Sequence, residues 1–181
     1  TPSREESDYW DGAIPWASVK DLTSSNPSTT AESITEEGLS SSASRLIPAG
    51  TPIVATRMAV GRTAVFARDV AINQDLKAIF VNPCLLNSKY LFHFLLGNEE
   101  LLASKGTGST VKGIRLDDLL QLPIAVPPLP EQKKIAEILS GVDKEIGVLL
   151  KKKEKLEKTL TAYLGIAISS DGESIELQEL C

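Results

Sequence analysis

The chain has 181 residues, of which 42% are hydrophobic, and this content is enough for one compact domain with an appendage. No apolar run reaches the roughly 18 to 20 residues of a membrane-spanning helix, and the N-terminus lacks the charged and apolar regions of a signal peptide. We therefore expect a cytoplasmic protein without a membrane partner, and the net charge of −5 argues against general nucleic-acid binding over its whole surface.

Residues 1–44 form a polar and acidic region that is rich in Ser, Thr and Asp. They carry two basic and eight acidic side chains. Ile14, Pro15, Trp16 and Val19 are the first apolar residues that can anchor this region to a core. The pattern predicts loops and short strands, without a long helix.

The composition changes after Gly50, where β-branched residues lie between Gly and Pro. This predicts two strands within residues 51–67 around a turn near Gly61, and a further strand at residues 78–81. Residues 45–115 carry nine basic against four acidic side chains, whereas residues 116–181 carry eight basic and twelve acidic ones. A positive middle region between two acidic ones is compatible with a single DNA-facing surface.

Helical patterns begin near residue 87. Asn87 or Ser88 can cap a helix whose apolar residues follow i, i+4 spacing and which ends at Gly97. A second helical turn is predicted at residues 99–103, a flexible loop at 105–110, a short helix at 116–120 and a short strand at 124–126. Together these elements predict an α+β fold, in which a mixed globular domain occupies residues 1–127.

A long helix follows the proline-rich segment 127–132, which reads PPLPEQ. Proline fits the first turn of a helix, where its missing N–H costs nothing, and Glu131 suits the positive end of the helix dipole. From residue 131 to 164 such a helix would be about 50 Å long at about 1.5 Å per residue. We therefore predict a coiled-coil spacer helix at residues 128–165, followed by a polar tail at 166–181.

The apolar residues of this helix recur with spacings that alternate between three and four, as in a two-helix seam. Lys153 interrupts the seam, which is tolerable if its ammonium group reaches solvent or an acidic residue of the partner helix. We expect the seam to make the protein a homodimer. The predicted dimer interface consists of Ile135, Leu139, Val142, Ile146, Leu149, Leu156 and Leu160.

No segment of the sequence has the pattern of a catalytic or metal centre. Residues 106–112 read GTGSTVK, but in a nucleotide-hydrolysing loop Ser or Thr follows the lysine, whereas Gly113 follows Lys112 here. Contact of this loop with a DNA phosphate and a plain helix-exit loop both stay open. Residues 82–85 lack the second proline and the aromatic residue of an amino-methyltransferase motif. Cys84, Cys181 and the single histidine lack metal-ligand spacing, so we expect no cofactor, no metal and no catalytic residue.

Polar residues of the positive middle region are candidates for DNA contact. Arginine side chains match the hydrogen-bonding edge of guanine, and Asn or Gln amides match adenine. Lysine and arginine also neutralise phosphates. The predicted DNA-binding residues are Arg57, Arg62, Asn73, Gln74, Lys112 and Arg115.

Several short motifs, taken in order, resemble the specificity subunit of type I restriction-modification systems. They read TPS at 1–3, YWDG at 9–12, IPW at 14–16, DL at 21–22, ITEEGL at 34–39, PAGT at 48–51, VGR at 60–62, INQD at 72–75, GST at 108–110 and PPLPEQ at 127–132. The resemblance covers nearly everything up to about residue 146, and its specificity lies in the ordered set, since each motif is short.

The resemblance implies a non-catalytic subunit that recognises double-stranded DNA and positions an adenine methyltransferase subunit and a restriction subunit. Members of this family carry two target recognition domains, each followed by a spacer helix, and the two helices pair antiparallel. This chain has one such domain and one helix, so it resembles half a subunit that would pair with a second copy. The alternative from the residues alone is a coiled-coil adaptor that binds protein and not DNA.

Overall fold

The protein is described by a computed structural model that covers residues 1–108 and 112–170, with side chains up to residue 163. It divides into a first compact unit, Thr1–Ala136, and a second unit that begins at Glu137. Because the division falls after Ala136, the first turns of the long helix belong to the globular unit.

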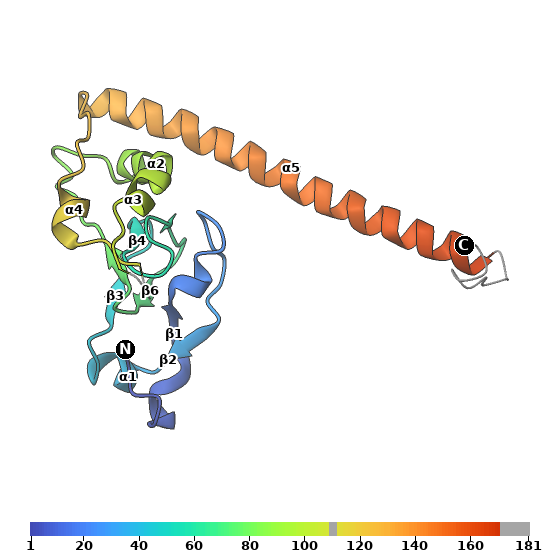
Figure 1. The fold of residues 1–181 in the computed structure, drawn as a ribbon, viewed down its shortest axis with the longest axis horizontal. Helices are drawn as coiled ribbons and strands as arrows, with labels where there is room; N and C mark the ends of the chain where they lie inside the picture. Colours follow the sequence, from blue (N-terminus) through green and yellow to red (C-terminus); the bar gives the residue numbers. More distant parts are fainter. Residues whose placement is uncertain (109–111, 171–181) are drawn as a thin grey trace. The chain divides into compact units, whose positions relative to one another are not determined.

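The elements confirm a mixed α+β fold with a long C-terminal helix (Figure 1). The strands are β1 Trp10–Ala17, β2 Glu32–Ile34, β3 Arg45–Ile47, β4 Ile53–Ala55, β5 Thr63–Ala64, β6 Val70–Ile72 and β7 Leu76–Ala78. The helices are α1 Glu36–Ser40, α2 Ser88–Gly97, α3 Glu99–Ser104, α4 Leu116–Leu120 and α5 Leu129–Ser170, with 3-10 turns η1 Ser7–Tyr9 and η2 Val19–Asp21.

The strands form two sheets. The first has the order β2-β1-β6-β3, in which β1 and β6 run parallel and the other neighbours run antiparallel. The second has the order β5-β4-β7 and is antiparallel throughout. Because β1 and β6 are distant in sequence, this parallel pair joins the N-terminal region to the middle of the chain.

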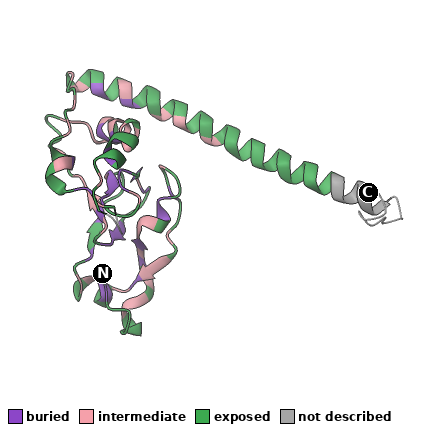
Figure 2. Ribbon diagram, in the orientation of Figure 1, coloured by how far each residue is buried: buried purple, intermediate pink, exposed green. Residues whose placement is uncertain are grey.

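Strand β4 lies between two layers of side chains, and all three of its residues are buried. Ile53 and Ala55 point into a core shared with residues of the first sheet, such as Ile47 and Val70. Val54 points the other way, into a cluster with Leu95 of α2 and with residues of α3 and α4. Successive side chains of a strand point to opposite faces, so β4 needs apolar residues at every position. Figure 2 shows this region as buried.

The turn near Gly61 is confirmed, since β4 and β5 pair on either side of it. Gly61 has φ of +88°, and a Cβ atom added there would lie 2.5 Å from the carbonyl oxygen of Glu99. The turn therefore requires glycine both for its backbone conformation and for the close approach of α3.

The helix signals are also confirmed. The Asn87 side chain accepts a hydrogen bond from the Tyr90 N–H at 3.0 Å, and α2 ends at Gly97. The strand predicted at 78–81 lies earlier, as β7, and the strand predicted at 124–126 is wrong. In that segment the Ala125 carbonyl accepts from the Tyr90 hydroxyl at 2.8 Å, so a side chain takes the place of a neighbouring strand.

A cluster around Arg4 ties the N-terminus to the first sheet. The Arg4 guanidinium lies 3.8 Å from the centre of the Trp10 ring and 5.5 Å from that of Trp16. It also forms a two-pronged ion pair with Glu32 of β2, with one hydrogen bond of 2.8 Å. The hydrogen bond from Arg4 lowers the pKa of the Glu32 carboxyl below its ordinary 4.5.

Replacing Arg4 by Leu is expected to lower the free energy of unfolding by about 1 kcal/mol at neutral pH, because an exposed cation–π contact and an exposed ion pair are both lost. Since the pKa of Glu32 is lowered in the folded state, its share of the stability is present above pH 4.5 and is lost as the pH falls through the folded-state value. The difference between the parent and the variant should therefore narrow in acid. Urea unfolding followed by tryptophan fluorescence, at neutral pH and in acid, measures the free energies of unfolding of the parent and the variant. An equal difference between the two proteins under both conditions would contradict the ion pair.

Gln132 fixes the start of α5 to the globular unit. Its side chain is fully buried, and its amide oxygen accepts from the Asn87 N–H at 2.8 Å. Its amide nitrogen donates to the carbonyl of Leu85 at 3.0 Å and to that of Pro127 at 2.8 Å. One side chain thus satisfies three backbone groups from the loop before α2 and the loop before α5.

The apolar seam of α5 is exposed over most of its length. Leu139, Leu149 and Leu156 are 40%, 62% and 60% exposed. The Lys153 ammonium lies 3.7 Å from a Glu157 carboxylate oxygen, so the acidic partner of this lysine is on its own helix. The helix continues to Ser170, five residues beyond the predicted limit of 165, and the part of the predicted tail at 171–181 lies outside the described residues.

Candidate functional site

Three segments of the positive middle region meet beyond the end of β4. The backbone N–H groups of Thr56 and Met58 donate to the carbonyls of Asp75 and Lys112, at 2.8 and 3.0 Å. The Ile114 N–H in turn donates to the Thr56 carbonyl at 2.9 Å. Residues 56–62, the turn between β6 and β7, and the segment around Lys112 are therefore held together through their backbones. We call these three segments the loop cluster.

Arg57 lies at the centre of the loop cluster. One of its guanidinium nitrogens is 3.5 Å from a carboxylate oxygen of Asp75, and this is an ion pair rather than a close hydrogen bond. That oxygen is buried and accepts no hydrogen bond from the described residues, so the Arg57 charge is what compensates it. The Arg57 side chain remains 56% exposed. The pair orients a guanidinium group that can still contact a ligand from solvent.

The turn between β6 and β7 contains both predicted amide residues, and the structure separates their roles. Asn73 is buried, and its side-chain oxygen accepts from the Asp75 N–H at 3.1 Å, so its amide shapes the turn. Gln74 is exposed, and its side-chain oxygen contacts the Thr1 hydroxyl. Of the two amides, Gln74 is the one that solvent reaches.

Arg62 and Lys112 line one hollow of about 330 Å³ together with Met58, Glu99 and Glu100. An Arg62 nitrogen donates to the Leu22 carbonyl at 3.2 Å. Glu99 accepts from the Thr63 N–H at 2.7 Å, which fixes its carboxylate beside the turn at Gly61. The hollow therefore has mixed charge, with two basic and two acidic side chains on its walls.

Arg115 is exposed and precedes the first turn of α4. It follows Ile114, whose side chain is buried in the cluster that contains Val54. Burial of Ile114 fixes the segment, while Arg115, which follows it, is exposed. Of the loop predicted as a phosphate contact, residues 109–111 lie outside the described residues.

Sequence reasoning missed Asp75 and Met58. Asp75 enters the sequence-based prediction only through the charge count and the motif at 72–75, whereas in the structure its carboxylate compensates Arg57. Met58 is 63% exposed with φ of +65°, and its side chain lines the hollow together with Arg62 and Lys112. An Asp after Asn-Gln suggests a turn, but the segment opposite that turn is set by the tertiary fold.

Two absences bear on the chemistry. Among residues 1–108 and 112–170, no group of three or more His, Cys, Asp and Glu side chains is arranged to hold a metal ion. In the same part of the chain, no helix has both the length and the apolar character needed to cross a membrane.

Comparison with known proteins gives the family. Residues 1–158 match the family model described as "Type I restriction modification DNA specificity domain". The chain belongs to this family. The resemblance carried by the ordered motifs is thereby confirmed.

Two curated relatives of this specificity-domain family illustrate the match. The chain is 34% identical over 150 residues to the EcoR124I/EcoR124II specificity subunit of Escherichia coli, which covers 79% of the chain and 37% of that protein. It is 31% identical over 163 residues to the MjaIX specificity subunit of Methanocaldococcus jannaschii, covering 87% of the chain and 38% of that protein. The chain therefore spans less than half the length of these relatives.

Solved structures support the same fold. The HsdS subunit from Thermoanaerobacter tengcongensis aligns with a TM-score of 0.61 at 22% identity, over 83% of this chain and 35% of that one. A chain from a structural study of complex assembly and conformational transition of the type I R-M system aligns with a TM-score of 0.68 at 21% identity, over 90% of this chain and 39% of that one. At such identities the likeness establishes the fold alone.

Proposed function

We propose that this chain is a sequence-specific DNA-recognition subunit of a type I restriction-modification complex, in which two copies of the chain replace one long specificity subunit. It would position an adenine methyltransferase subunit and a restriction subunit on a two-part DNA site. Membership of the specificity-domain family over residues 1–158 supports the DNA-recognition part of this proposal.

The observation that carries the proposal is the loop cluster. It brings Arg57, Gln74 and Lys112 from three distant segments to one part of the globular unit, each with an exposed side chain. Loops held by a rigid core are the usual carriers of recognition residues, because the core fixes their backbone while their side chains reach the ligand. Basic and amide side chains in such loops suit the edges of bases and the phosphates between them.

Within the loop cluster, separate roles are proposed for the predicted residues. Arg57 and Arg62 would contact guanine, and Gln74 adenine, because their hydrogen-bonding groups match these bases. The remaining two exposed basic residues, Lys112 and Arg115, would neutralise phosphates. We leave Asn73 out of the contact group, since its amide is engaged in the turn. No residue is assigned a catalytic role, because the chemistry would belong to the partner subunits.

The seam of α5 would join two copies in antiparallel orientation. Two identical recognition domains related by a twofold axis read the same half-site on opposite DNA strands. The proposed target is therefore an interrupted palindrome.

Replacing Lys112 by Ala is expected to weaken binding to all DNA sequences and to reduce the slope of log affinity against log salt by about one unit, because one phosphate contact is lost.

Replacing Arg57 by Ala should cost about 1–3 kcal/mol of DNA-binding free energy and relax the preference at one base position. Fluorescence anisotropy across salt concentrations measures both effects, on a target first selected from a random DNA library. The methyltransferase subunit is added in a parallel series.

Lys89→Ala is the matched control, since Lys89 is an exposed lysine on α2 outside the loop cluster. Equal salt slopes for the Lys89 and Lys112 variants would remove Lys112 from the interface. Absence of DNA binding by the parent, alone and with the methyltransferase subunit, would refute the proposed function and favour the protein-binding adaptor.

A further inference from the structure

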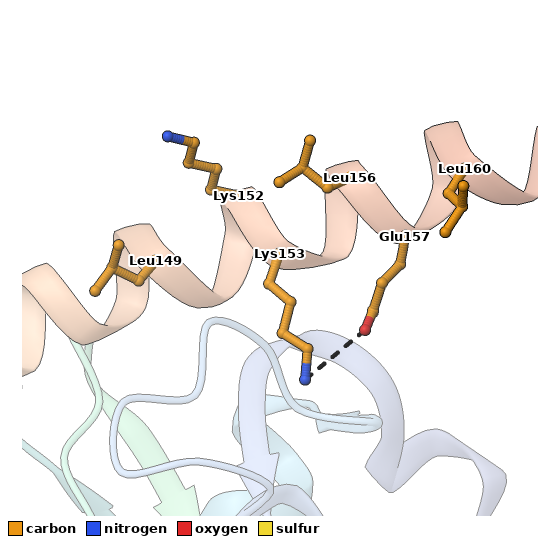
Figure 3. A pocket seen from close by; sticks show the side chains of 6 residues that line it. All are labelled: Leu149, Lys152, Lys153, Leu156, Glu157 and Leu160. Carbon is orange, nitrogen blue, oxygen red and sulfur yellow. Dashed lines mark ion pairs between the residues drawn. The ribbon is translucent and has the colours of Figure 1, made fainter.

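A hollow on the surface of α5 is walled by three leucines and by charged side chains (Figure 3). Its lining residues are Leu149, Lys152, Lys153, Leu156, Glu157 and Leu160. In a coiled coil, four neighbouring side chains of one helix form a hole that receives one side chain of the facing helix. The six residues make two adjoining holes, one bounded by residues 149, 152, 153 and 156 and the other by residues 153, 156, 157 and 160. An apolar floor open to water marks a surface that is stabilised by being covered.

We propose that Leu139 and Val142 of a second copy fill this hollow, and that the two α5 helices run antiparallel with the twofold axis between Gly147 and Val148. This inference rests on the proposed homodimer and specifies its alignment. The occupant is α5 itself, because its spacing and its charges fit one antiparallel alignment and disfavour the neighbouring ones.

The spacing of the seam gives the layers. In an antiparallel pair, residues of one half of the heptad seam face residues of the other half. With the axis between 147 and 148, all seam residues from 135 to 160 find a partner, and each pairing occurs twice. The layers are Ile135 with Leu160, Leu139 with Leu156, Val142 with Lys153, and Ile146 with Leu149. Gln132 takes no part, since its own domain buries it.

Charges beside the seam select this alignment. Glu145 and Lys152 both flank the seam on the same side, and in this register each Glu145 lies beside Lys152 of the second copy. Sliding one helix by one heptad in either direction instead brings Lys152 beside Lys152, or Glu145 beside Glu145. A parallel pair would place both Lys153 residues in one layer. Of these three antiparallel registers, only the proposed one places Glu145 beside Lys152.

Lys153 is compatible with this arrangement. Its stem forms part of the wall of the hollow, while its ammonium group lies 3.7 Å from Glu157 on the same helix. Val142 of the second copy would pack on the stem. The two Lys153 side chains of the pair would be about 16 Å apart along the axis at about 1.5 Å per residue, so they would not oppose each other.

Disulfide trapping tests the alignment directly. Cys84 and Cys181 are first replaced by Ser, so that introduced cysteines are the only thiols. Leu139→Cys chains are then mixed in separate arms with Leu156→Cys, Leu149→Cys or Tyr163→Cys chains, or kept alone, and oxidised after subunit exchange. These arms report the proposed register, the two shifted registers and the parallel pair, in that order.

A covalent heterodimer is expected with Leu156→Cys and only background in the other arms. A dominant disulfide in another arm, or no disulfide in any arm, overturns the register. DNA affinity of the reduced chains is measured in the same samples. Retained sequence-specific binding together with a failed cross-link would leave the proposed function standing and remove this inference alone.

A charge exchange gives a second, independent test. Glu145→Lys and Lys152→Glu each create two like-charge contacts in their own homodimer, so each variant dimer should dissociate roughly tenfold more readily than the parent. When the two variants are mixed, every flanking contact joins opposite charges, and heterodimers should form with the affinity of the parent. Mass measurement with one isotope-labelled variant counts the species. A statistical mixture of homodimers and heterodimers would refute the Glu145–Lys152 contact.

Discussion

Replacing Leu149 by Asp is expected to convert the proposed dimer to a monomer. Leu149 is 62% exposed on the single chain and lies in the two layers next to the proposed twofold axis. Each substitution removes a buried leucine, worth about 1.5–3 kcal/mol, and there are two per dimer. The carboxylates would also lose their water on pairing. The dissociation constant should therefore rise at least roughly a hundredfold.

Val148→Asp is the matched control for this experiment. Val148 precedes Leu149 and is similarly exposed, at 54%, but it lies on the face of the helix that points away from the seam. Light scattering over a range of concentrations gives the molecular mass of both variants, and circular dichroism verifies the helix. An unchanged mass for Leu149→Asp would mean that the seam is covered by something other than a second copy.

Replacing Gln132 by Leu is expected to destabilise the globular unit by about 2–5 kcal/mol. Leucine has a similar size, but it leaves the Asn87 N–H and the carbonyls of Leu85 and Pro127, all part-buried, without the partner that Gln132 supplies. Each unsatisfied buried group costs about 1–3 kcal/mol, and part of this is recovered where water can enter. Urea unfolding of the full chain measures the loss.

Two further variants separate hydrogen bonding from general damage to the helix. Lys133→Leu changes the neighbouring exposed residue and should leave the stability nearly unchanged. Gln132→Glu keeps the acceptor for Asn87 but turns a carboxylate toward two carbonyl oxygens. Burial and this repulsion favour its protonated form, so this variant should regain stability as the pH falls. Equal stability of the Gln132→Leu and Lys133→Leu variants would contradict the role of Gln132.

The parts of the fold that local chemistry determines could be predicted from the sequence. The cap at Asn87, the helix end at Gly97 and the seam of α5 depend on residues within a few positions of each other. The irregular structure of residues 124–126 could not be predicted from neighbouring residues, because the Ala125 carbonyl accepts a hydrogen bond from Tyr90 on the distant helix α2. The apolar residues there suggested a strand, but the segment is irregular and only Ile124 packs against the buried cluster that contains residues of α2, α3 and α4.

The candidate site shows the same limit. The positive middle region contains the loop cluster, in which Arg57, Gln74 and Lys112 lie. Asn73 looked equally suited to base contact, and only the folded turn shows that its amide is already engaged. The pairing of Arg57 with Asp75 joins two loops, so no pattern in either loop alone predicts it.

The loop cluster is joined by backbone groups of Thr56, Met58, Asp75, Lys112 and Ile114. Every amino acid except proline carries the same N–H and carbonyl groups, so these joints do not depend on which side chains the loops present. Apart from Arg57, whose charge compensates Asp75, the exposed residues of the cluster can therefore be replaced with little penalty to folding. Under the proposed function, a lineage of such proteins can acquire new DNA targets through a few substitutions, while the scaffold that carries them is inherited unchanged.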